Sequence, residues 1–299
     1  MNSTATSFVL SPERRDQLHQ AAHQIRRDII TAIAVAGDGH PGGALGAAEL
    51  FAALYFEVMH HNPREPQMPG RDRFVLSNGH ICAGLYSALA RAGYFPVAEL
   101  LTHRKIGSRL QGHPARTHLP DMVETSSGPL GQGLSVANGL ALAARLDGVQ
   151  SRVFALLGDG EMQEGQVWEA VMTAAHYKLQ NLTMFVSYNR LQIDGAVEDV
   201  MGIDPLAAKL ESFQWRVVEI DGHDIEAVVA AAQPAPTEDH RPTAVILRTV
   251  MGKGVSFMED KAAWHGGKLS MEQAQQALSG LGPAIGFDDI RHMDGTNVI

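Results

Sequence analysis

The chain has 299 residues, of which 45% are hydrophobic and 19% are charged, and its formal net charge is -9. This composition is typical of a globular protein with one large core or two modest domains. The acidic balance argues against nucleic acid as the main partner, because binding to a phosphate backbone requires a basic face. The single cysteine, Cys82, excludes an intrachain disulfide and favours a reducing compartment.

The N-terminal sequence shows no targeting signal. Residues 1–10 are polar and rich in Ser and Thr, without the basic region and apolar core of a secretory signal. No apolar run approaches the length of a membrane span. We therefore expect a cytoplasmic protein without a membrane partner.

Helical patterns dominate the first half of the chain. Ser11-Pro12-Glu13 combines a capping residue, a first-turn proline and an early acid, and apolar residues then recur at helical spacing until about Gly37. Further helices are expected over residues 47–59, 81–92 and 134–146, and a short strand over residues 74–76.

Strands and helices alternate regularly in the second half. Strands are expected over residues 153–157, 182–186, 215–220 and 244–247, and helices over residues 166–176, 205–210 and 225–232. This rhythm predicts an α/β fold, a doubly wound parallel sheet flanked by helices, in one domain covering residues 1–299. Residues 283–299 are expected to form a C-terminal tail on the surface or against a partner.

Long glycine-rich loops interrupt this pattern at residues 37–46, 107–133 and 252–268. A compact domain rarely keeps such loops without a functional role. We therefore expect most of the chemistry to lie in these loops.

A metal site is predicted where two strands end. The apolar run 153–157 leads into Gly158-Asp159-Gly160, and the run 182–186 ends near Asn189. Ligands of parallel sheets bind beyond the carboxyl ends of the strands. A carboxylate, an amide oxygen and a free backbone carbonyl would suit magnesium and leave positions for phosphate oxygens. The rival interpretation of a Gly-Asp-Gly sequence is an ordinary turn.

Four histidines lie in turns flanked by glycine or proline: His40, His80, His113 and His265. Neutral imidazoles exchange protons near pH 7, and protonated imidazoles attract phosphate. Zinc binding is the rival explanation, but the spacings fit no common zinc motif and the pattern has no cysteine ligands.

The segment Ser127–Gly133 contains three glycines and precedes a predicted helix. Such a turn either holds an anion on free backbone N–H groups or packs tightly on a neighbouring loop. Glu161, Glu164 and Glu169 crowd the start of the next predicted helix, where the helix dipole stabilises acids. A buried Glu164 would instead be able to share or relay a proton.

These motifs together resemble the N-terminal, diphosphate-binding part of transketolases, which use thiamine diphosphate. The resemblance covers most of residues 11–268, and residues 252–260 are similar to the form found in transketolases made as two chains. The shared segments, in chain order, are Gly39-His40-Pro41-Gly42, Asp72-Arg73-Phe74-Val75-Leu76-Ser77-Asn78-Gly79-His80, Gly112-His113-Pro114, Gly128-Pro129-Leu130-Gly131-Gln132-Gly133, Gly158-Asp159-Gly160 with Gln163-Glu164-Gly165, Asn189 with Ile193-Asp194-Gly195, and Trp264-His265-Gly266.

The resemblance implies roles for individual residues. Asp159, the side chain of Asn189 and the carbonyl of Leu191 would hold Mg²⁺ or Ca²⁺. The cofactor would be bound by His80, Gly128, Pro129, Leu130, Gly158, Asp159, Gly160, Glu164, Asn189, Ile193 and His265. The catalytic groups would be His40, His80, His113 and His265, which face the sugar or the diphosphate, and Glu164, which joins an acid network between cofactor sites.

The resemblance also implies a partner chain. Family members continue into a pyrimidine-binding domain, which brings the glutamate that activates the cofactor, and into a C-terminal domain. The chain would therefore be one subunit of an α2β2 heterotetramer with a separate subunit that carries both domains. The expected reaction, in carbohydrate metabolism, transfers a two-carbon ketol unit from a ketose or its phosphate to an aldose or its phosphate.

Other thiamine diphosphate enzymes share the predicted metal pair. A deoxyxylulose-phosphate synthase and the α subunit of a 2-oxoacid dehydrogenase are alternatives, although the Gly-His-Pro-Gly and Ser-Asn-Gly-His segments favour a transketolase. A non-catalytic cofactor-binding subunit is a third alternative, and the four retained histidines argue against it. The sequence does not rank ordinary pentose phosphates against branched, amino- or sulfo-sugars as substrates.

Overall fold

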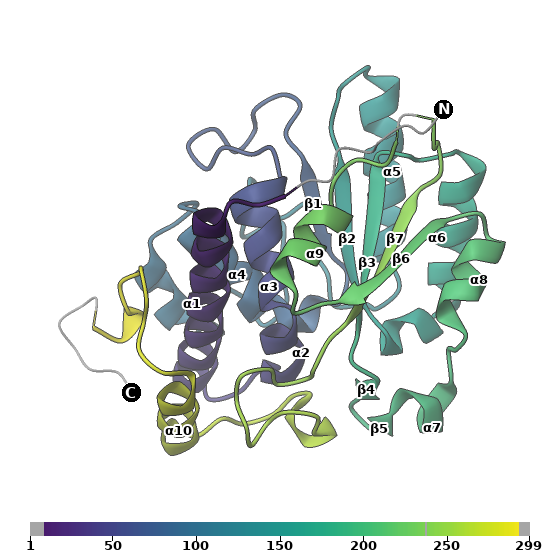
Figure 1. Cartoon of the computed structure of the whole chain (residues 1–299). Coiled ribbons are helices and arrows are strands. Elements are labelled where there is room, and N and C mark those ends of the chain that lie inside the picture. Colours follow the sequence, from purple (N-terminus) through teal and green to yellow (C-terminus); the bar gives the residue numbers. More distant parts are fainter. Residues whose placement is uncertain (1–8, 237, 293–299) are drawn as a thin grey trace.

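The computed structural model describes residues 9–236 and 238–292, so the expectations for residues 1–8 and 293–299 lie outside the described residues. Its centre is a five-stranded parallel sheet with strand order β1-β2-β3-β7-β6 (Figure 1). The strands are β1 (Arg73–Leu76), β2 (Val153–Gly158), β3 (Leu182–Tyr188), β6 (Arg216–Asp221) and β7 (Thr243–Arg248), and β4 (Leu191–Gln192) pairs with β5 (Gly195–Ala196) in a small antiparallel ribbon.

Helices cover both faces of this sheet (Figure 1). One face carries α1, α3, α4 and α9, and the other carries α5, α6 and α8. The helices are α1 (Pro12–Ala36), α2 (Pro41–Gly46), α3 (Ala48–Ala53), α4 (Cys82–Arg91), α5 (Gly133–Leu146), α6 (Gly165–His176), α7 (Val197–Met201), α8 (Leu206–Ser212), α9 (Ile225–Ala231) and α10 (Met271–Leu281). None of the described helices is both long and apolar enough to cross a membrane.

Alternating strand residues divide the core into two halves. Phe154 and Leu156 of β2 pack with α1, α3 and α4, whereas Val153, Ala155 and Leu157 pack with α5 and α6. Successive side chains of a strand point to opposite faces, so a strand covered on both sides reads as a continuous apolar run. This packing explains why the run 153–157 carries no polar residue, and it confirms the predicted doubly wound sheet.

Most predicted elements are present near their expected limits. Ser11 caps α1 by accepting a hydrogen bond from the Arg14 amide at 3.2 Å, and Gly37 ends it with a left-handed backbone, φ 82°. The prediction of a continuous loop over residues 37–46 is wrong, because Pro41–Gly46 forms α2 with proline at its first position. The predicted helix over residues 47–59 is α3 followed by a π-helix at Leu54–Val58.

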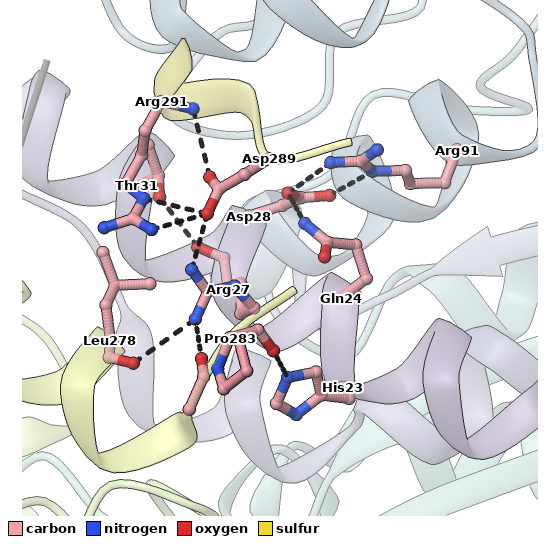
Figure 2. Close-up of polar contacts among 11 residues, drawn as sticks. His23, Gln24, Arg27, Asp28, Thr31, Arg91, Leu278, Pro283, Asp289 and Arg291 are labelled. Atoms are coloured by element: carbon pink, nitrogen blue, oxygen red, sulfur yellow. Dashed lines mark hydrogen bonds and ion pairs between the residues drawn. The ribbon is translucent and has the colours of Figure 1, made fainter. Parts of the chain in front are cut away.

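The C-terminal segment packs against the first helix, which the sequence left open. Arg27 of α1 is buried, and its guanidinium donates to the carbonyls of Leu278 and Gly282 and, at 2.6 Å, to the Asp289 carboxylate (Figure 2). Arg291 also donates to Asp289, at 2.7 Å. Residues 283–292 are therefore fixed to α1 by a charge network, and α10, which precedes them, was not predicted.

This network predicts the effect of removing its carboxylate. In Asp289→Ala, the buried Arg27 guanidinium would lose its counter-ion, a change that typically costs about 3–5 kcal/mol. We expect urea unfolding of the chain to show a loss of this order. Asp288→Ala is the matched control, because Asp288 is the adjacent residue and is exposed. Equal stability of the two variants would contradict the network's importance.

Candidate active site

The two predicted metal-binding side chains follow neighbouring strands. Gly158, at the end of β2, is in register with Ser187 of β3, so Asp159 and Asn189 leave the sheet side by side. One Asp159 carboxylate oxygen accepts from the Gly160 amide at 2.8 Å, and the other accepts from the Arg190 amide. The Asn189 side-chain oxygen accepts from the Leu191 amide at 2.9 Å. The predicted proximity of the two strand ends is thus observed.

Asp159 is a buried carboxyl group with no cationic partner among the described residues. Burial raises its pKa to about 6, although hydrogen bonds from the Arg190 and Gly160 amides favour the charged form. A metal cation bound here would supply the positive charge that this buried carboxylate lacks.

The four histidines gather in one cluster although they come from distant loops. The ring centroid of His40 lies 5.1 Å from that of His80, 6.3 Å from that of His113 and 5.9 Å from that of His265. The rings of His80 and His265 lie 5.0 Å apart. His80 follows β1, which pairs with β2, so the cluster borders the end of the strand that leads to Asp159.

These imidazoles are neutral near pH 7. Burial and the neighbouring imidazoles lower the pKa of His80 to about 3. Burial, His265 and Arg104 lower the pKa of His40 to about 4, and burial also lowers the pKa values of His113 and His265. The idea that protonated histidines attract phosphate therefore does not hold for the ligand-free chain. The neutral rings instead offer one hydrogen-bond donor and one acceptor each.

The rival zinc interpretation is not supported. Within residues 9–236 and 238–292, no group of three or more His, Cys, Asp or Glu side chains is arranged to hold a metal ion. The predicted Asp159 site is of a different kind, because two of its three ligands would be a side-chain amide and a backbone carbonyl.

Backbone contacts hold the histidine loops together. Gly39 and Gly267 form an antiparallel bridge with N···O distances of 3.1 and 2.8 Å, which joins the loops of His40 and His265. A Cβ on Gly79 would lie 2.9 Å from the carbonyl carbon of Ser127, so the His80 loop also touches the loop that follows His113. These close approaches are the physical reason for several of the glycines.

Orphaned polar atoms mark a place for a polar ligand. His40 Nδ1, Asn78 Oδ1 and Ser127 Oγ are buried and have no hydrogen-bond partner among the described residues. Leaving a buried polar atom unpaired costs about 1–3 kcal/mol, and such atoms in native proteins usually have a functional explanation. All three belong to the loops around the histidine cluster, so the residues present fit a bound polar cofactor.

Two backbone amides of the segment Ser127–Gly133 already have partners within the protein. The Gly131 amide donates to Glu161 at 2.9 Å, and the Gly133 amide donates to Ser77 Oγ at 3.1 Å. These two contacts favour tight packing against neighbouring loops at Gly131 and Gly133. The Gly131 and Gly133 amides are thus not free to bind an anion in this structure.

Two apolar side chains of this region face outward. Leu130 is 37% exposed and Ile193 is 67% exposed, so both side chains are accessible to a ligand or partner. Pro129, beside Leu130, is also exposed. Glu164 and Glu169 are exposed as well, so the condition of a buried Glu164 is not met within this chain.

Sequence reasoning missed three residues of the site. Asn78 and Ser127 lie within the motif segments, but no role was expected for either side chain. Glu161 was interpreted as an acid at a helix start, although α6 begins later, at Gly165. A signal existed for Asn78, because a polar residue directly after an apolar strand lies at the carboxyl edge of the sheet. No pattern in the sequence revealed the partners of Glu161.

The raised pKa of Asp159 predicts how metal binding depends on pH. Magnesium requires the carboxylate form, so protons compete with the metal below about pH 6. We expect the dissociation constant for Mg²⁺ to be constant above about pH 7 and to rise about tenfold per pH unit below pH 6. Calorimetric titration between pH 5 and 8 measures this, and a pH-independent constant would exclude Asp159 as a ligand.

A parallel sheet with glycine-rich loops and proton-exchanging histidines at its carboxyl edge is the architecture of a cofactor-binding domain. Residues 17–290 match the family described as "Transketolase, thiamine diphosphate binding domain". The chain belongs to the transketolase family.

Three relatives define the extent of the match. The chain is 41% identical to the 6-deoxy-6-sulfo-D-fructose transketolase subunit SqwG of Clostridium sp. (strain MSTE9), covering 91% of this chain and 98% of the relative. It is 40% identical to an apulose-4-phosphate transketolase subunit from Actinobacillus succinogenes, covering 89% and 96%. A crystal structure of transketolase from Pichia stipitis in complex with sedoheptulose 7-phosphate has a TM-score of 0.83 and 37% identity, and the match covers 89% of this chain but 41% of that one.

Proposed function

We propose that this chain is the N-terminal, thiamine diphosphate-binding subunit of a split transketolase, active with a separate subunit that carries the pyrimidine-binding and C-terminal domains. The enzyme transfers a two-carbon ketol unit from a ketose to an aldose. The observation that carries this proposal is the cluster of four neutral histidines beside the ends of β1 and β2.

The comparisons support the split arrangement. The chain covers 98% and 96% of two relatives that are named as subunits, but 41% of a transketolase chain from Pichia stipitis. The cofactor-activating glutamate is then supplied by the partner, and an α2β2 assembly places each active site at the boundary between chains. Exposed Leu130 and Ile193 suit such a boundary.

The residues of this chain would hold the cofactor through different contacts. Asp159, the side chain of Asn189 and the carbonyl of Leu191 would bind Mg²⁺ or Ca²⁺, whose oxygen preference matches this set. His80, Gly160 and His265 would contact the diphosphate. The rings would lie against Gly128, Pro129, Leu130 and Ile193.

Thiamine diphosphate, when bound, acts as an electron sink while the C–C bond of the ketose breaks. The contribution of this chain is orientation and proton handling at the sugar hydroxyls. His40, His113 and His265 are suited to this role because a neutral imidazole has a free lone pair on one ring nitrogen and an N–H on the other. Their lowered pKa values keep both functions available at pH 7.

The substrate is proposed to be a ketose with a terminal anionic group. The two relatives named as subunits act on a sulfonated sugar and a sugar phosphate, respectively, by their names. The four histidines are neutral and provide no fixed cation, although Arg104 lies close enough to lower the pKa values of His40 and His113. The anionic end would therefore be held by Arg104, by cations of the partner, or by both.

Reconstitution tests this function directly. The chain alone, its partner alone and a mixture of both are assayed with thiamine diphosphate and Mg²⁺, using a ketose phosphate or sulfo-ketose donor and an aldose phosphate acceptor. We expect ketol transfer only in the mixture. Activity of the chain alone would contradict the split arrangement, and consumption of pyruvate in place of a ketose would contradict the reaction class.

A further inference from the structure

Glu161 is a buried carboxylate that three different loops share. It is 3% exposed and lies two residues after Asp159, in the short 3-10 helix Gly160–Gln163. One of its oxygens accepts from Ser77 Oγ and from the Gly131 amide at 2.9 Å, and the other accepts from the Gly158 amide at 3.2 Å. Three donors around two oxygens match a carboxylate, which accepts hydrogen bonds and donates none.

Ser77 extends this contact to the first turn of a helix. Its hydroxyl donates to Glu161 and accepts from the Gly133 amide at 3.1 Å, and Gly133 is the first residue of α5. The first N–H groups of a helix have no partner within the helix and favour a negative charge. Glu161 and Ser77 therefore supply, from inside the protein, the anion and the acceptor that this helix start requires.

The three loops joined in this way each carry part of the proposed cofactor site. Ser77 precedes His80, Gly131 and Gly133 follow Gly128 and Leu130, and Gly158 precedes Asp159. A shift of any one loop would thus be transmitted to the other two through one carboxylate.

We propose that Glu161, acting through Ser77, is a positioning residue that fixes the three cofactor-contacting loops of this chain in their relative places before the cofactor binds. This inference rests on the proposed function for the identity of the cofactor, whereas the clamp itself is a property of this chain.

Burial and hydrogen bonding act on the pKa of Glu161 in opposite directions. Burial raises the pKa of Glu161, and the charge of Glu164 acts in the same direction, while the hydrogen bonds from Ser77, Gly131 and Gly158 lower it.

Hydrogen exchange of individual backbone amides tests the clamp in the full chain without cofactor. In Glu161→Ala, the Gly131 and Gly158 amides should exchange at least about tenfold faster, the effect of losing a hydrogen bond to a charged group. In Ser77→Ala, the Gly133 amide should lose protection while Gly158 keeps it. Glu211→Ala, an exposed glutamate of α8, is the control and should change none of the three.

Cofactor binding by the assembled complex tests the consequence. Glu161→Ala should raise the dissociation constant for thiamine diphosphate about tenfold or more at saturating Mg²⁺, while kcat at saturating cofactor changes by less than about threefold. Glu161→Gln should recover part of this affinity, because it restores one acceptor oxygen, and it serves as the measurement if the alanine variant does not fold. In Glu161→Gln, the Gly131 amide should stay protected from exchange, whereas the Gly158 amide should exchange fast.

Two results would overturn the clamp: unchanged exchange at Gly131 and Gly158 in Glu161→Ala and Glu161→Gln, or wild-type cofactor affinity in both variants. Failure of the wild-type complex to bind thiamine diphosphate would refute the proposed function instead. The exchange pattern of the chain alone would still decide whether Glu161 fixes the loops.

Discussion

Replacing Asp159 by asparagine is expected to abolish magnesium-dependent binding of thiamine diphosphate by the assembled enzyme and to leave the chain folded. Asp159 is the only carboxylate in the proposed ligand set, and changes to groups that merely support a metal ligand already cost about 10–100-fold in affinity. Loss of the charged ligand itself should therefore exceed about 100-fold.

The stability of the metal-free chain should respond differently. The pKa of Asp159 is about 6 in the folded chain and 3.8 in its usual environment, so the folded state binds more protons between these values. The stabilisation of the folded chain by this bound proton is complete below pH 3.8 and is lost as the pH rises through 6. At pH 8 the buried charge of Asp159 lowers the free energy of unfolding by about 3 kcal/mol, and an uncharged asparagine avoids this cost. The asparagine also loses one hydrogen bond, which costs about 1–3 kcal/mol and offsets part or all of the gain.

Asp159→Asn should therefore melt at or above the wild-type temperature at pH 8 while it fails to bind the metal and cofactor. Asp221→Asn provides the matched control, because Asp221 ends β6 at the same edge of the sheet and is exposed. It should retain binding. If Asp159→Asn bound cofactor with wild-type affinity, the assignment of the metal site would be wrong.

Adding a single methyl group at Gly133 is expected to damage the site severely. A Cβ there would lie 2.7 Å from Ser77 Cα and closer still to the Ser77 side chain, so α5 or the His80 loop must move. Overpacking of this kind costs about 1–3 kcal/mol and occasionally more. Gly133→Ala should lower the melting temperature and weaken cofactor binding about tenfold or more, measured by thermal unfolding and calorimetry.

The same helix contains its own control. Gly139 of α5 is exposed, and a Cβ at that position would meet no described atom within 4 Å. Gly139→Ala should stabilise the chain by up to about 1 kcal/mol through helix propensity and leave cofactor binding unchanged. Equal behaviour of the two alanine variants would show that close packing at Gly133 is unimportant.

The sheet and the proximity of Asp159 and Asn189 were predictable because local patterns determine them. Apolar runs such as residues 153–157 indicate the parallel strands, because both faces of these strands are covered. The polar residues that follow each run indicate the carboxyl edge of the sheet. Asp159 and Asn189 could therefore be placed together without knowledge of the strand order.

Contacts between distant loops were beyond such reasoning. The loops of His40 and His265 meet through a backbone bridge between Gly39 and Gly267, which no side-chain pattern encodes. Glu161 resembles any acid near a helix start until its partners Ser77, Gly131 and Gly158 are known. The contact of Asp289 with Arg27 joins the two ends of the described chain and has no periodicity that reveals it.

The central claim is that a divalent ion binds where β2 and β3 end. The most direct measurement is anomalous diffraction from crystals of the assembled enzyme with thiamine diphosphate and Mn²⁺ in place of Mg²⁺. We predict a single anomalous peak per copy of this chain, within about 2.0–2.5 Å of oxygens from Asp159, Asn189 and Leu191 and next to the diphosphate. A peak within the histidine cluster, or a diphosphate bound away from these strand ends, would contradict the proposal.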